Sequence, residues 1–307
     1  MKRVLKGVGL MLLLLVIYYL AQTVVTLVFG IIFLVSGGAA SLVPAVPGVM
    51  PDVEAIMSEM LGFISRQTPW ILLLSVVLSL PFYYLLYRKR QEELWTFVRI
   101  QPVDAVALPA LIFLGFSLNI VIDILVALVS QIGALHTVFE QYDALGEVLT
   151  GGSVWWTLLA VGIVAPIFEE ILFRGLIFGE LRKLMPIRLA LVFQALAFGI
   201  YHLNVVQSTY AVVIGLALGF VYYRSNSIVS AIIVHITVNS TSILLFQLVP
   251  AEQLDRFAVL IVCAGVALLI ISSVFIFLHK SFRHTMDNSL YHNSRQTPPY
   301  GPSGDVL

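Results

Sequence analysis

Long apolar segments, separated by short polar loops, dominate the pattern of residues along the chain. A helix needs about 20 mostly apolar residues to cross a bilayer. Segments of this kind predict roughly eight membrane-spanning helices, near residues 8–36, 69–87, 105–132, 154–181, 187–203, 207–224, 227–249 and 256–279. The predicted fold is therefore all-α, a polytopic transmembrane helical bundle.

The composition agrees with this pattern and excludes an ordinary soluble domain. Hydrophobic residues make up 60% of the chain and charged residues only 11%, whereas soluble domains carry about 25% charged residues. A bilayer offers the apolar solvent that such a surface requires. The net charge is zero, so bulk electrostatics gives no sign of a nucleic-acid partner, and none is expected.

The spans are predicted to form one domain. No long polar segment interrupts them, so residues 1–280 are expected to be a single membrane-embedded unit. The apolar run from Val8 to Val35 is longer than the ~7–15 residues of a signal-peptide core, and it is interpreted as a retained first span rather than a cleaved signal. Residues 281–307 are polar and rich in proline and glycine, which predicts a disordered tail.

Basic residues cluster in every second loop. Lys and Arg occur at the N-terminus, in the second, fourth and sixth loops and in the tail, while the other loops carry mostly Asp and Glu. Loops rich in Lys and Arg stay in the cytoplasm. With roughly eight spans, both termini are predicted to be cytoplasmic, in a multi-pass protein of the cell membrane.

Two of the acidic loops contain apolar residues at helical spacing. One series runs from Val53 to Ile64 and the other from Val138 to Leu149. Such amphipathic segments are typical of helices that lie on a membrane surface. The alternative is that they gate the entry of a substrate embedded in the lipid.

The fourth span contains three charged residues, in a setting where each costs about 2.5–3.5 kcal/mol. They are Glu169, Glu170 and Arg174. Residues four apart share a helix face, so Glu170 and Arg174 are expected to form a buried ion pair that fixes helix packing. Adjacent residues point about 100° apart, which leaves Glu169 without a local cation. Glu169 is therefore the candidate to take a proton from water.

Three further polar residues lie within the fifth and seventh spans, and they are His202, His235 and Asn239. Counting about 1.5 Å per residue from the cytoplasmic ends gives depths of roughly 18, 21, 12 and 18 Å for Glu169, His202, His235 and Asn239. All four fall in one slab near the midplane, which predicts a single site.

Asn119 and Asp123 on the third span are also four residues apart. The same count places Asp123 about 27 Å up, near the outer surface. A helix-packing role is expected there rather than a part in the site.

Three motifs follow one another on the predicted spans, namely Glu169-Glu170-x-x-x-Arg174, Phe198-x-x-x-His202 and His235-x-x-x-Asn239. This ordered set resembles the CPBP family, also called the Abi family, which comprises the CAAX prenyl endopeptidases and the bacteriocin-processing enzymes. The resemblance covers about residues 155–248. It implies an all-helical membrane endopeptidase whose site opens to the bilayer or the cytoplasm. Its peptide or protein substrates are, in the best-known branch, prenylated CAAX proteins.

Peptide hydrolysis requires an activated water and donors for the developing oxyanion. Glu169 is predicted to be the general base and His202 to help hold the water. His235 and Asn239 are predicted to donate hydrogen bonds to the oxyanion. Glu170 is expected mainly to pair with Arg174, with a second role at the water left open.

A metal centre would use the same side chains. Glu169, His202 and His235 would make a His₂Glu set, which is known for catalytic zinc. The usual His-Glu-x-x-His pattern of zinc proteases is absent from the sequence. A metal-free glutamate mechanism is favoured, and zinc stays the alternative cofactor.

Two other classes of membrane protein compete with a peptidase. A proton-coupled transporter also places carboxylates and histidines within its spans, but it is expected to show inverted repeats, and none is visible. A non-catalytic bacteriocin-immunity or binding protein would keep the fold without requiring Glu169.

Overall fold

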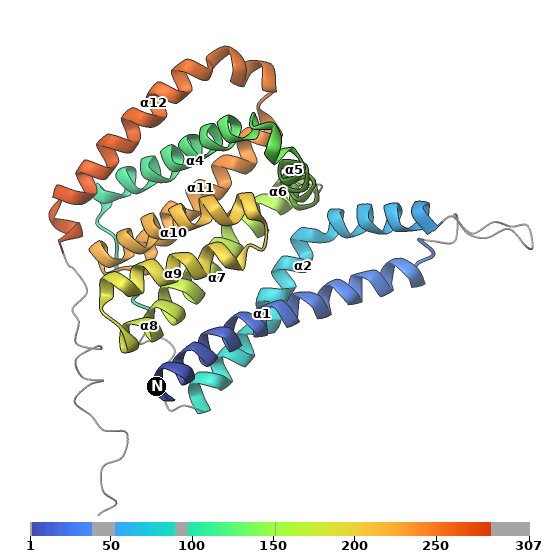
Figure 1. The fold of residues 1–307 in the computed structure, drawn as a ribbon, viewed down its shortest axis with the longest axis horizontal. Helices are drawn as coiled ribbons and strands as arrows, with labels where there is room; N and C mark the ends of the chain where they lie inside the picture. The colour runs from blue at the N-terminus through green and yellow to red at the C-terminus, as the bar shows by residue number, and fades with distance from the viewer. Residues whose placement is uncertain (1, 39–52, 90–97, 151, 284–307) are drawn as a thin grey trace, which may run out of the picture.

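The computed structural model describes residues 2–38, 53–89, 98–150 and 152–283, and these ranges are almost entirely helical (Figure 1). Among them there is no β-strand. The α-helices are α1 (Lys2–Val35), α2 (Val53–Lys89), α4 (Leu108–Ser130), α5 (His136–Thr150), α6 (Val154–Thr157), α7 (Ala165–Glu170), α8 (Phe178–Leu184), α9 (Ile187–Tyr201), α10 (Val205–Ser225), α11 (Ile228–Leu248) and α12 (Ala251–Leu278). The predicted all-α, polytopic bundle is confirmed.

Seven helical segments in the described part of the chain are long and apolar enough to cross a membrane. They lie in α1, α2, α4, the continuous segment Val154–Leu184, α10, α11 and α12. The fifth predicted span is instead the 15-residue helix α9, which is about 22 Å long and falls short of the ~30 Å hydrocarbon core. Pro186 stands before α9, and Leu203, with a φ of 55°, turns the chain after it. The predicted set of spans therefore becomes seven full spans and one short apolar helix.

The first amphipathic segment is not a separate surface helix, contrary to the prediction. It is continuous with the second span, because α2 runs unbroken from Val53 to Lys89. Pro69 lies inside α2, where a missing N–H removes a backbone hydrogen bond and bends the helix, and Figure 1 shows α2 changing direction along its length. The second amphipathic segment is a helix of its own, α5, as predicted.

The helices pack around the fourth span. In Figure 1, α4 lies between α12 and α11, α9 pairs with α10, and α1 pairs with α2 along one side of the molecule. The buried core is richest between Phe168 and Leu181. In contrast, α1 and α12 expose large apolar side chains along much of their length, as expected for helices that face lipid.

The described chain begins and ends at the same end of the bundle. Near its start, Gly7 packs against Leu184 at the end of α8. Near its end, Arg224 Nη2 donates to the Phe277 carbonyl at 2.8 Å. Phe282 is buried, so packing continues slightly past the predicted domain end, and the predicted tail beyond Arg283 lies outside the described residues. Which end faces the cytoplasm stays a prediction.

Candidate active site

The fourth span changes its helical pitch on both sides of the two glutamates. The π-helical segments Leu158–Val164 and Ile171–Ile177 flank α7. Pro166 lies in the first turn of α7. Because proline has no N–H, one carbonyl group about one turn earlier loses its usual donor. π-helical turns often occur at functional sites.

Two side chains of α11 bind carbonyl groups of the first π-helical segment. Asn239 Nδ2 donates to the Val161 carbonyl at 3.0 Å, and Ser240 Oγ donates to the Gly162 carbonyl at 3.4 Å. The bonds hold α11 against the fourth span about two turns before the glutamates. The Asn239 amide has a second N–H and a carbonyl oxygen, so this contact uses only part of its bonding capacity.

Glu170 and Arg174 form the predicted buried ion pair. Arg174 Nη1 lies 2.9 Å from Glu170 Oε1, and neither side chain is exposed. Arg174 Nη2 also donates to the Gly215 carbonyl at 3.3 Å, and the guanidinium carbon lies 4.6 Å from the centre of the Phe198 ring. Arg174 therefore joins the fourth span to α9 and α10.

His235 connects the two glutamates. Its Nδ1 lies 2.7 Å from Glu170 Oε1, and its Nε2 lies 3.7 Å from Glu169 Oε2. An ionised carboxylate only accepts hydrogen bonds, so Nδ1 carries a proton. The bond fixes the ring and directs Nε2 toward Glu169. The sequence pattern pairs Glu170 with Arg174 and does not reveal this second partner, which is 65 residues away.

His202 is held in a tight turn between α9 and α10. Its Nδ1 donates to the Phe198 carbonyl at 2.8 Å, which in the neutral ring leaves Nε2 as an acceptor. Leu203 follows in the left-handed region, a backbone conformation that is costly for a leucine and is concentrated at functional sites. Asn204 then caps α10 by accepting from the Gln207 N–H at 3.0 Å.

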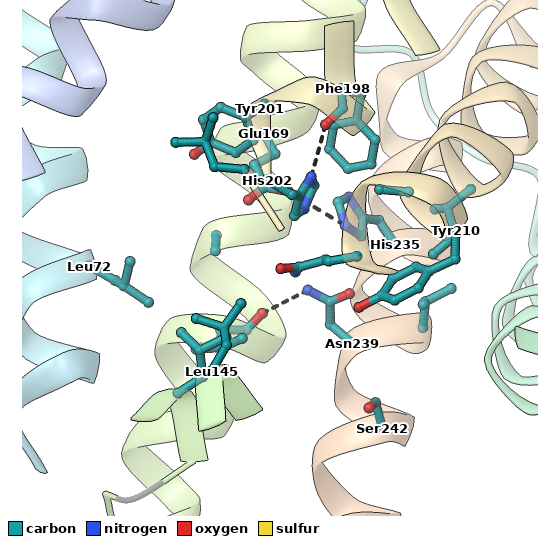
Figure 2. Close-up of a pocket in the computed structure, with 18 of the residues that line it drawn as sticks. Leu72, Leu145, Glu169, Phe198, Tyr201, His202, Tyr210, His235, Asn239 and Ser242 are labelled. Carbon is teal, nitrogen blue, oxygen red and sulfur yellow. Dashed lines mark hydrogen bonds and ion pairs between the residues drawn. The ribbon is translucent and has the colours of Figure 1, made fainter. Parts of the chain in front are cut away.

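One cavity of about 260 Å³ brings these residues together. Figure 2 shows Glu169, His202, His235 and Asn239 converging from three separate helical segments. Glu170 does not line this cavity and lies behind His235. The four residues that the depth count grouped line one cavity, and Glu170 contacts the site through the His235 ring.

The first span also contributes to the cavity, which the sequence pattern did not indicate. Tyr18 and Tyr19 of α1 line it. The Tyr18 ring packs against Phe168, with ring centres 4.7 Å apart, and the Tyr19 hydroxyl donates to the Tyr201 carbonyl. The sequence signal for this contact is a pair of adjacent tyrosines in a mostly apolar span.

Asn119 and Asp123 also line the cavity, contrary to the expectation that they serve helix packing alone. The cavity extends from Glu169 as far as α5, where Tyr142 forms part of its wall. A count along straight helices gives depth but not the extent of a cavity, so it separated Asp123 from the site.

The zinc alternative has no preformed ligand set. Within the described ranges, no three His, Cys, Asp or Glu side chains are grouped so that they could hold a metal ion. The bonds of His235 Nδ1 to Glu170 and of His202 Nδ1 to the Phe198 carbonyl leave both Nε2 atoms open, so these bonds do not themselves argue against a metal.

Comparison with known proteins bears on the same segment. Residues 151–241 match the family model described as "Type II CAAX prenyl endopeptidase Rce1-like". The predicted resemblance to the CPBP family is confirmed. All six motif residues lie in this CPBP-like segment, namely Glu169, Glu170, Arg174, His202, His235 and Asn239.

A protein of Bacillus subtilis, YdiL, named as a candidate membrane peptidase, is 32% identical to this chain over 96 residues. That alignment covers 31% of this chain and 39% of the length of the relative. No solved structure matches the chain at a significant level. The CPBP-like segment and this relative support a membrane endopeptidase, and the helices outside the segment are not covered by either finding.

Proposed function

We propose that this protein is an intramembrane endopeptidase in which Glu169 activates the hydrolytic water. The observation that carries the proposal is the convergence of Glu169, His202, His235 and Asn239 on one cavity inside a membrane bundle. Charged and polar side chains are costly in a span. A shared cavity gives water access to these side chains, and a hydrolytic role explains why polar residues are kept within the spans.

Glu169 is the proposed general base. It lines the cavity with a side chain that is 13% exposed, and among the described residues its ion-pair contact is with His235 rather than with Lys or Arg. Because this contact is 3.7 Å long, it is not a tight hydrogen bond and leaves the carboxylate able to accept a proton from water. His202 Nε2, which is the acceptor end of the ring, is proposed to hold the same water.

His235 and Asn239 are proposed to stabilise the oxyanion. Glu170 holds His235 at Nδ1, and Nε2 faces the cavity, where an N–H on this atom is the proposed oxyanion donor. Asn239 offers its second amide N–H beside it. Donors fixed in advance at the position of the developing charge are commonly the largest single contribution to such catalysis. Glu170 is then a positioning residue that acts through His235.

The chemistry is proposed to proceed without a metal ion, on peptide or protein substrates that reach the cavity from the membrane or an adjoining aqueous face. The support for a metal-free mechanism is that no three His, Cys, Asp or Glu side chains of the described residues are grouped so that they could hold a metal ion. The cell membrane is the proposed location, with both termini cytoplasmic.

A cleavage assay with Glu169→Gln tests the proposal. The purified full chain in detergent is incubated with a mixture of apolar peptides, and new termini are identified by mass spectrometry. Glu147→Gln is the matched control, because Glu147 is exposed on α5 and does not line the cavity. We expect cleavage by the wild type and by the control and none above background by Glu169→Gln. Equal turnover by all three proteins would remove Glu169 as the base.

A further inference from the structure

An acidic and aromatic patch lies on the cavity wall apart from the proposed catalytic groups. Asp123 and Asn119, one turn apart on α4, line the cavity together with Tyr142 of α5 and Tyr210 of α10. The two tyrosine rings meet edge to face, with their centres 6.2 Å apart. These four residues are called the acidic subsite below. None of them has a part in the hydrolysis described above.

The acidic subsite contains oxygen atoms with unused acceptor capacity. Asn119 is only 4% exposed, and its Oδ1 has no hydrogen-bond partner in the described protein. Buried polar atoms are almost always paired. Asp123 is exposed and has a hydrogen bond from the Asn119 side chain. Among the described residues it forms no ion pair, and no Lys or Arg lines the cavity. Both residues therefore offer oxygen atoms to a donor from outside the protein.

The position of Asp123 within a membrane span indicates that the residue has a function. It belongs to the membrane-spanning segment Ala105–Ser130, and ionisable side chains within spans are rare and by default mark a function. The other carboxylates of the spans that line or support the cavity, Glu169 and Glu170, contact His235. Asp123 is the one cavity-lining carboxylate outside that arrangement.

A carboxylate beside an amide oxygen and two tyrosine rings suits a positively charged donor. An ammonium or guanidinium group can make a charge-assisted hydrogen bond to Asp123, a further bond to Asn119 Oδ1 and a favourable contact with an aromatic face. An anionic group would be repelled by Asp123 and by Glu169. The chemistry of the acidic subsite therefore favours a cation over a carboxylate.

We propose that the acidic subsite binds an ammonium or guanidinium group of the peptide substrate, either a Lys or Arg side chain or a free amino terminus, close to the scissile bond. This inference rests on the proposed function and adds a substrate class to it. Because the subsite and Glu169 line one cavity of about 260 Å³, the cation lies within a few residues of the bond that is cleaved.

Selectivity between matched peptides tests the inference. The substrates are apolar peptides with a lysine, an acetyllysine or a glutamate placed in turn at each position around the cleaved bond. Both ends are blocked, and a parallel set with a free amino terminus and no lysine separates the two sources of the cation. The proteins are the wild type, the isosteric variant Asp123→Asn and the control Asp143→Asn, which removes an exposed charge from α5 outside the cavity. All assays use a nonionic detergent without amine-containing lipids.

We expect the wild type and Asp143→Asn to prefer a cationic peptide over its neutral counterpart by about tenfold in kcat/KM, the order expected for a partly solvated charge-assisted contact. In Asp123→Asn this ratio should fall to near one. If the preference appears only in the set with a free amino terminus, that terminus is the ligand. An unchanged ratio in Asp123→Asn, with normal cleavage, would overturn the subsite and leave the proposed function standing.

A binding measurement separates failure of the subsite from failure of the proposed function. Lysine and acetyllysine peptides with a neutral dye are titrated into Glu169→Gln and into the double variant Glu169→Gln/Asp123→Asn. Tighter binding of the lysine peptide to the first protein alone supports the subsite even when the wild type cleaves nothing. Equal binding of both peptides to both proteins, or no binding at all, overturns it.

Discussion

Replacing Arg174 by alanine should destabilise the protein before it produces any specific kinetic defect. The change removes the partner that lies 2.9 Å from Glu170 in a fully buried pair. It also removes the donor to the Gly215 carbonyl and the cation that faces the Phe198 ring. Breaking a buried ion pair by removing one partner costs about 3–5 kcal/mol, because the other charge is left uncompensated. Glu170 keeps only its bond to His235.

A loss at the lower end of this range already has a large effect. About 3 kcal/mol shifts the folding equilibrium more than a hundredfold, since about 1.4 kcal/mol is a factor of ten. The assay is thermal unfolding of the purified variant in detergent, together with the amount of protein that inserts into membranes. We expect a lower melting temperature and poor yield for Arg174→Ala.

A double variant shows whether the charge left behind is the cause. Glu170→Leu combined with Arg174→Leu removes both charges, and replacing a whole buried pair by apolar side chains is often neutral or stabilising. The double variant should therefore be more stable than Arg174→Ala, although it should be inactive because His235 loses its carboxylate. A stable, well-expressed but inactive Arg174→Ala would refute the structural account and indicate a direct role of Arg174 in catalysis.

Three further predictions follow from the site and the topology. Asn239→Ala should lower kcat by about 10²–10³-fold, the usual cost of one oxyanion donor, with little change in substrate binding. The control Ser240→Ala removes the neighbouring contact with the fourth span and should change kcat little. Equal effects of the two substitutions would mean that Asn239 acts only by holding α11. The pure protein should contain no stoichiometric metal and should stay active after exhaustive chelation. One zinc per chain, lost and regained with activity, would make Glu169 and the two histidines ligands. A reporter fused after Leu307 should be active only on the cytoplasmic side. Activity on the outer side would contradict the predicted cytoplasmic C-terminus.

Much of the bundle and of its central site follows from local sequence patterns. Apolar segment length sets the spans, because each spanning helix must satisfy its own backbone groups within the hydrocarbon. Helical periodicity places Glu169 and Glu170 on different faces of the fourth span, and it places Glu170 and Arg174 on the same face. Depth counting then brings His202, His235 and Asn239 to the same level, since rise per residue is nearly constant along a helix.

Features that depend on how the helices pack could not be predicted in this way. Tyr18 reaches the cavity because α1 lies beside the fourth span, and no periodicity within α1 encodes that neighbour. Asp123 was separated from the site by a depth count that ignores the extension of the cavity toward α5. The bonds from Asn239 and Ser240 to the Val161 and Gly162 carbonyls join two helices, and no pattern within either helix encodes them.

The adjacent glutamates have a common physical explanation in His235. Because neighbouring residues on a helix point about 100° apart, one carboxylate can face the cavity while the other faces the interior of the bundle. A single imidazole ring then reaches both, with its two nitrogens 2.7 Å from Glu170 and 3.7 Å from Glu169. Glu170 in turn is held by Arg174, whose other contacts are on α9 and α10. The position of the histidine beside the proposed base therefore depends on the packing of four helical segments, namely the fourth span, α9, α10 and α11, and stability and activity are coupled through Glu170.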